Sequence, residues 1–207
     1  MKKTSKFILV VGIVILILLA SLIYQTFYKS QDTNEDDRIK VDNGMNLAKG
    51  NQEAKIIMIE FSDFQCPFCK SALPVIDKIL NEYNVAFYYR NFPLSIHENS
   101  MIAAEAAECA NEQGKFWQYH DILFANQDKL DKESLQKYAE QLNLNVSRFN
   151  LCFGSGKYKA EIERDIVAGN RLGVSGTPTF FINGIKIEGA IENEMKKIIE
   201  EELKNTK

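Results

Sequence analysis

Hydrophobic and polar positions divide the chain into three parts. Residues 7–24 form one apolar run without a charged side chain, and residues 29–54 are mostly polar or charged. From residue 55 onward the apolar positions recur with the periods of strands and helices, which indicates a folded domain. We therefore predict an anchor, a flexible tether and one domain, at residues 1–28, 29–51 and 52–207.

The apolar run is long enough to cross a membrane. Residues 7–24 extend roughly 27 Å as a helix, close to the thickness of the hydrocarbon layer. Three lysines precede the run and none follows it directly, so the positive-inside rule places the amino end in the cytoplasm and the domain outside. A cleaved signal peptide is the alternative, but the run is longer than the usual h-region and no small-x-small site ends it. We expect an uncleaved, single-pass signal-anchor in the cell membrane.

The segment at residues 29–51 contains few large apolar side chains. Such a composition cannot bury enough surface to offset the conformational entropy that folding removes. We expect it to be a flexible tether between the membrane and the domain.

Within the domain, the pattern predicts elements in the order β-α-β, a helical block, then β-β-α. Asn183-Gly184 between the last two strands is a strong hairpin signal, and Gly154 and Gly173 are expected to end helices. The predicted strands, of which the first is central, lie at residues 55–61, 85–92, 179–182 and 185–188. The predicted helices lie at residues 67–83, 99–111, 115–126, 132–142, 146–153, 157–172 and 191–204.

Composition agrees with one globular domain and an appendage. The 207 residues are 45% hydrophobic and 26% charged, which excludes a fully disordered or collagen-like chain. The formal net charge is −3, so the chain lacks the basic footprint of a nucleic-acid-binding protein. Four cysteines are too few for a small disulfide scaffold, and the core need not depend on them.

Candidate chemistry is concentrated in Cys66-Pro67-Phe68-Cys69, at the predicted strand-to-helix junction. A cysteine at a helix N-terminus lies beside unpaired N–H groups, which stabilise its thiolate. The two-residue spacing lets the second cysteine resolve a mixed disulfide, and Pro67 suits the first helical turn. This motif predicts a redox-active dithiol.

A zinc site is the competing interpretation of the same two cysteines. A structural zinc site normally needs four ligands. Cys109 and Cys152 form no second C-x-x-C motif, and the two histidines, His97 and His120, are scattered. We therefore expect no metal.

Longer segments carry a resemblance to a known family. From about residue 52 to the C-terminus the chain resembles the DsbA-like thiol-disulfide oxidoreductases, in the segments EFSDFQCPFC, AAECANEQGKFWQYHDILF and GVSGTPTFFINGIKIEG. The resemblance implies an α/β protein with a thioredoxin fold and an inserted helical subdomain at about residues 97–172. The single-pass layout further resembles outward-facing members from bacteria that lack an outer membrane.

The resemblance also implies roles for individual residues. Cys66 matches the exposed nucleophile and Cys69 the buried resolving cysteine. Thr177-Pro178 matches the cis-proline loop that faces the disulfide, with an ordinary trans-proline at the start of a strand as the alternative. Glu60 matches a buried acid beneath the active site, whose pKa burial would raise. The alternative for Glu60 is a strand-end carboxylate that faces solvent.

Phe68 departs from the family's pattern. Members that oxidise most strongly often carry a histidine in the dipeptide, whereas phenylalanine offers the Cys66 thiolate neither a donor nor a positive charge. The reduced form should therefore be less stabilised, which puts strong oxidising power in doubt.

Cys109 and Cys152 both fall in the predicted helical block. Paired cysteines persist in an oxidising compartment, so we expect a structural disulfide between these two residues. Two inert buried thiols are the alternative.

These observations together predict a membrane-anchored oxidase that passes the Cys66–Cys69 disulfide to exported proteins with free thiols. The enzyme needs no bound cofactor, and a quinone-linked membrane partner is expected to reoxidise it. Two alternatives stay open: a disulfide reductase or isomerase that uses the same dithiol, and a non-catalytic substrate-binding or chaperone module.

Overall fold

The computed structural model describes residues 47–205 and, separately, Ser21. The predicted anchor at residues 1–28, Ser21 apart, and the predicted tether as far as residue 46 lie outside the described residues. Among the helices of residues 47–205, none has the length and apolar character of a membrane span.

One mixed sheet forms the centre of the domain. Its strands are β1 (Ala48–Gly50), β2 (Ile56–Ser62), β3 (Val85–Asn91), β4 (Thr179–Ile182) and β5 (Ile185–Glu188). They lie in the order β1-β3-β2-β4-β5, with β2 parallel to β3 and the other neighbours antiparallel. The central position predicted for the first strand is confirmed, because β2 is the middle strand.

The helices follow the predicted ranges closely, with one correction. They are α2 (Pro67–Glu82), α3 (Ser100–Asn111), α4 (Phe116–Ala125), α5 (Lys132–Gln141), α6 (Val146–Ser155), α7 (Lys159–Arg171) and α8 (Glu192–Asn205). α6 continues through Gly154, because the left-handed turn that ends it is formed by Gly156, with φ of 62°. Gly173, with φ of 71°, follows α7 as predicted.

The edge strand β1 corrects the predicted tether. Residues 48–50 were expected to belong to that tether, yet they pair with β3, with Ala48 opposite Tyr88. The Trp117 indole N–H donates to the Ala48 carbonyl at 3.0 Å and ties the strand to α4. Three residues are too few to show a strand period, so the pairing comes from an available sheet edge.

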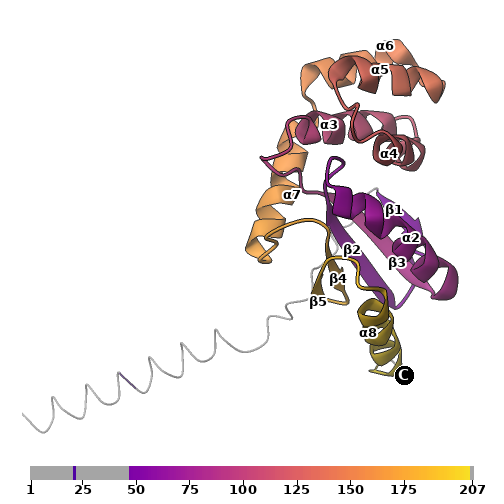
Figure 1. Ribbon diagram of the computed structural model, residues 1–207, viewed down its shortest axis with the longest axis vertical. Helices are drawn as coiled ribbons and strands as arrows, with labels where there is room; N and C mark the ends of the chain where they lie inside the picture. Colours follow the sequence, from indigo (N-terminus) through magenta and orange to yellow (C-terminus); the bar gives the residue numbers. More distant parts are fainter. Residues whose placement is uncertain (1–20, 22–46, 206–207) are drawn as a thin grey trace, which may run out of the picture. The chain divides into compact units, whose positions relative to one another are not determined.

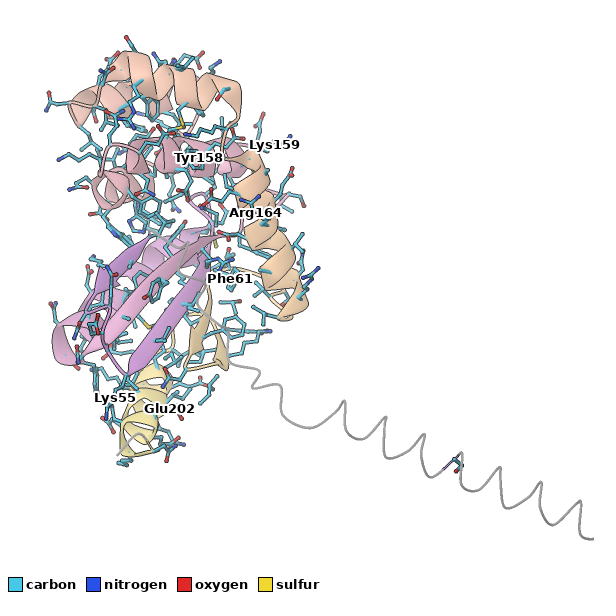
Figure 2. All side chains as sticks on the ribbon, turned by 180° about the vertical axis from the view of Figure 1, so that it is seen from behind. Lys55, Phe61, Tyr158, Lys159, Arg164 and Glu202 are labelled. Atoms are coloured by element: carbon cyan, nitrogen blue, oxygen red, sulfur yellow. A yellow bond between two sulfur atoms is a disulfide. The ribbon has the colours of Figure 1, made fainter. Side chains whose placement is uncertain are left out.

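Alternate residues of β2 face opposite sides of the sheet. Ile56 and Met58 pack in one cluster with residues of α2 and α8. Phe61 points to the other face, beside α7 (Figure 2). Gly169 lets α7 lie close to this face of the sheet. A Cβ at Gly169 would come within 2.7 Å of the Phe92 ring and 3.1 Å of the Phe61 ring.

Helices α3 to α6 gather at one end of the sheet, and α7 leads back alongside it towards β4 (Figure 1). A disulfide joins Cys109 of α3 to Cys152 of α6, so the predicted pairing is confirmed. The helical block thus has its own covalent link, next to the end of β2 from which α2 begins.

Candidate active site: a dithiol beside a cis-proline loop

Cys66 lies where the chain leaves the sheet and enters a helix. It is the N-cap of α2, with Pro67 in the first turn. Its backbone N–H donates to the Asp63 carbonyl at 3.0 Å, which closes the turn after β2. Proline is suited to this turn because the first N–H groups of a helix have no intrahelical partner. The local sequence therefore sets the first sulfur at the helix N-terminus, as predicted.

A loop that is distant in the sequence, at Thr177–Pro178, lies against the Cys66 sulfur. The Thr177–Pro178 peptide bond is cis, as the resemblance implied. The Cys66 sulfur lies 3.2 Å from the Thr177 carbonyl oxygen, to which its thiol form donates. The loop leads directly into β4, which pairs with β2, so the sheet places segments about 110 residues apart against each other.

The Cys66 sulfur is less accessible than the resemblance implied. Only 3% of Cys66 is exposed, and Cys69 is fully buried. The expectation of an exposed nucleophile is therefore wrong, although Cys66 is the more accessible of the two. Besides the Thr177 loop, Gln127 restrains the turn, because its side-chain amide donates to the carbonyls of Phe64 and Cys66, both at 2.8 Å.

The surroundings separate the acidities of the two thiols. The pKa of Cys66 is lowered to about 5, first by the hydrogen bond from the Cys69 thiol and also by backbone N–H groups of the helix start, against the effect of burial. Burial raises the pKa of Cys69 far above its ordinary value, and the hydrogen bond to Cys66 and the Glu60 charge raise it further. At neutral pH the first sulfur is a thiolate and the second a thiol.

Glu60 lies in the sheet beneath this pair. It is 1% exposed, so the alternative of a carboxylate facing solvent is excluded. Burial raises its pKa to about 8, although the Ser62 hydroxyl, which donates to Oε1 at 2.9 Å, opposes the shift. Glu60 is therefore protonated in a large share of molecules at neutral pH.

Two buried groups near the dithiol were missed by the sequence analysis. Asp63 accepts hydrogen bonds from the Leu94 backbone N–H at 2.8 Å and from His97 Nδ1 at 2.7 Å. Tyr89 is the cross-strand neighbour of Glu60 in the β2–β3 register. The available signal was the position of polar residues at the end of a buried strand, directly before the C-x-x-C motif.

An open groove adjoins the cysteine loop. Its volume is about 400 Å³, and Phe68, Gly176, Pro178 and Ala190 are among its lining residues. Phe68 is 71% exposed, so the groove presents an apolar ring beside the Thr177 backbone. The groove can receive an extended peptide next to the Cys66 sulfur.

Comparison with known proteins assigns the family. A family model described as Thioredoxin matches residues 42–201. The chain belongs to the thioredoxin family. The relatives include a Na(+)/H(+) antiporter NhaA 3 of Salinispora tropica, 40% identical over 156 residues, and a Na(+)/H(+) antiporter NhaA of Herminiimonas arsenicoxydans, 32% identical over 152 residues. The matches cover 74% and 73% of this chain but 24% of each relative, so the chain spans about a quarter of their length.

Solved structures share the whole domain. A thioredoxin-like oxidoreductase from Silicibacter pomeroyi is 25% identical, with a TM-score of 0.73 over 83% of this chain and 99% of that one. BdbD from Bacillus subtilis is also 25% identical, with a TM-score of 0.68 over 76% and 92%. Wolbachia pipientis α-DsbA1 (24% identity, TM-score 0.68, covering 80% and 94%) shares the fold. The chain thus has a thioredoxin fold with a helical insertion, as these structures do.

Proposed function

We propose that the chain oxidises exported proteins by donating a disulfide formed between Cys66 and Cys69. The observation that carries this proposal is the pair of opposite pKa shifts beside the Thr177–Pro178 loop. A stabilised Cys66 thiolate favours the reduced dithiol, and a protein whose reduced form is stabilised gives its disulfide away readily. This supports oxidation over the alternatives of reduction or isomerisation.

The exchange balances in two steps. A substrate thiolate attacks Cys66, a new bond joins the two sulfurs, and the electron pair of the Cys66–Cys69 bond leaves on Cys69. A second substrate thiolate then attacks the substrate sulfur of the mixed disulfide and releases Cys66 as a thiolate. The substrate leaves oxidised and the enzyme reduced by two electrons.

The substrate is held, in this proposal, as an extended segment along the Thr177 backbone. Such a segment can pair with a free peptide edge in the manner of an added strand. The groove beside Phe68 then receives a neighbouring side chain of the substrate. A non-catalytic binding module would use the same groove but would leave substrate thiols unoxidised.

The proposed enzyme needs no bound cofactor, because the dithiol itself carries the electrons. A quinone-linked membrane protein is the proposed acceptor that restores the disulfide. We further propose an extracytoplasmic position, with residues 7–24 as the membrane anchor. After mild reduction of intact cells, a membrane-impermeant maleimide should label Cys66, and labelling only after lysis would contradict this placement.

Trapping experiments test the proposed chemistry. Cys69→Ala should accumulate mixed disulfides with exported proteins, because the resolving thiol is gone, and Cys66→Ala should accumulate few. The wild-type oxidised protein should also oxidise a reduced unfolded protein stoichiometrically. Equal trapping by both variants would refute the assignment of the nucleophile, and binding without oxidation would favour the chaperone alternative.

A further inference from the structure

We propose that the Ser62 hydroxyl carries a proton between Glu60 and Cys69 when the dithiol changes its redox state. The inference deepens the proposed function and rests on it. Ser62 is the last residue of β2 and lies two residues after Glu60, so both side chains occupy the sheet face that packs against α2. Both are buried, and the hydroxyl donates to Glu60 Oε1 at 2.9 Å.

The Cys69 sulfur lies at the same end of β2 as Ser62. The backbone N–H of Asp63, the residue directly after Ser62, donates to Cys69 Sγ over 3.5 Å. The sulfur therefore rests against the end of β2. The Ser62 hydroxyl lowers the pKa of Cys69, as a donor to its thiolate would, although burial is the dominant cause and keeps that pKa far above its ordinary value.

A hydroxyl can serve both neighbours because it donates one hydrogen bond and accepts others. When the Cys66–Cys69 bond breaks, Cys69 leaves as a thiolate inside an apolar site, where an uncompensated charge is costly. Ser62 then gives its hydroxyl proton to Cys69 and receives the proton of the Glu60 carboxylic acid. Glu60 ends as a carboxylate and Ser62 is unchanged. Formation of the disulfide runs the same steps in reverse.

The surrounding groups favour this direction. Glu60, with a pKa of about 8, is a much stronger acid than Cys69, so transfer to the Cys69 thiolate is downhill. The second oxygen of Glu60 has no hydrogen-bond partner within residues 47–205, so in that range only Ser62 binds the carboxyl group. Tyr89 faces the same site from β3, and its pKa is well above its ordinary value, chiefly through burial.

The neighbouring charged groups on other elements are already engaged or have a minor effect on Glu60. From α2, the Cys66 charge raises the pKa of Glu60, but only as a minor cause after burial. The Asp63 carboxylate is already engaged, because it accepts from His97 and from the Leu94 and Gln65 backbone N–H groups. From α3, Glu108 is bound by the Asn91 side chain at 2.8 Å. Glu60 is therefore the acid that can pass a proton to Ser62.

Stopped-flow kinetics of the oxidised protein with glutathione tests the relay. Ser62→Ala should slow opening of the disulfide by about 10²-fold, the lower end of general acid catalysis. The wild-type rate, expressed per glutathione thiolate, should fall as the pH rises through about 8, where Glu60 loses its proton, and this pH dependence should vanish in Ser62→Ala. Ser62→Thr, which keeps the hydroxyl, should restore both the rate and its pH dependence.

A matched control is Ser100→Ala. Ser100 is also buried, but its hydroxyl donates to the carbonyls of Leu94 and His97, and its loss should leave the pH profile unchanged. The relay would be overturned by a Ser62→Ala protein with the wild-type rate. It would also be overturned by one with a slower rate but the same pH dependence near pH 8. A wild-type protein that exchanges no disulfide would overturn the proposed function itself. Should Ser62→Thr fail to fold, the profile of Ser62→Ala decides alone.

Discussion

The chain contains two pairs of buried cysteines with different chemistry. Cys109 and Cys152 are joined, 43 positions apart in the sequence, and Cys66 and Cys69 are free thiols within one C-x-x-C motif. All four belong to the same hydrophobic cluster. Burial therefore does not distinguish the reactive pair from the structural pair.

The difference lies in the groups within hydrogen-bond reach. Cys66 meets a helix start and the Thr177 carbonyl, and Cys69 meets a backbone N–H and a buried acid. The hydrogen bond from Cys69 and the helix start favour the Cys66 thiolate, whereas burial and the Glu60 charge favour the Cys69 thiol. The Cys109–Cys152 pair links α3 to α6. Its sulfurs do not titrate, so it needs no groups that set their protonation state.

Removal of the structural disulfide should produce the largest loss of stability. Cys109→Ala/Cys152→Ala should lower the free energy of unfolding by up to about 4 kcal/mol, because the cross-link closes a long loop in the unfolded chain. Urea unfolding measures the change, and disulfide exchange at Cys66 should continue in the folded variant. The Cys66→Ala/Cys69→Ala protein is the control, since it loses no bond relative to a wild type with free Cys66 and Cys69 thiols. Equal destabilisation of both double variants would contradict the distinction between the pairs.

Two buried glutamates, one near each cysteine pair, extend the comparison between the reactive and the structural pair. Burial raises the pKa of Glu60, next to the dithiol, and of Glu108, next to Cys109, to about 8 in both cases. In the folded protein each keeps a proton that the unfolded chain loses above about pH 4.5. Each therefore stabilises the fold at low pH, and this contribution is lost as the pH rises towards 8.

Glutamine substitutions should remove that dependence. Relative to wild type, Glu60→Gln and Glu108→Gln should each gain stability between pH 4.5 and 8, by a few kcal/mol, since one pKa unit corresponds to about 1.4 kcal/mol. Urea unfolding across this pH range measures the gain. Only Glu60→Gln should also slow exchange, because only Glu60 lies beneath the dithiol. A slowed Glu108→Gln protein would show that the two regions are coupled.

The regular parts of the fold were predictable because they follow local periods. The helices of the insertion and the hairpin at Asn183-Gly184 carry their signals in short windows of sequence. β1 was missed, since a three-residue edge strand depends on the neighbouring β3 rather than on its own pattern. The left-handed residue that ends α6 could have been Gly154 or Gly156 from the sequence, and in the structure it is Gly156.

The site was predictable at the cysteines and less so around them. The C-x-x-C spacing and the family resemblance locate Cys66, Cys69 and the Thr177–Pro178 loop. The near-complete burial of Cys66 could not be foreseen, because it depends on a loop about 110 residues away. The contacts of Ser62 and Asp63 likewise depend on where α2 and the loop after β3 lie against the end of β2.

The smallest predicted effect concerns Phe68. This side chain lies in the first turn of α2, at the rim of the groove, and is 71% exposed. Phe68→His would add a hydrogen-bond donor near the Cys66 thiolate, and a positive charge when protonated. Both favour the thiolate, so the pKa of Cys66 should fall further and the reduction potential should rise. Because solvent screens an exposed charge, we expect a rise on the order of 30 mV, equivalent to about 1.4 kcal/mol for two electrons.

Two titrations on the same variants measure this effect: thiolate absorbance against pH, and redox equilibrium with glutathione. Phe68→Leu is the matched control, because it keeps an apolar side chain and adds no donor, so its potential should equal that of wild type. A potential that stays unchanged or falls in a folded Phe68→His protein would show that the dipeptide does not tune the site. The hydrogen bond from the Cys69 thiol, the largest cause of the low Cys66 pKa, would then set the balance between thiol and thiolate.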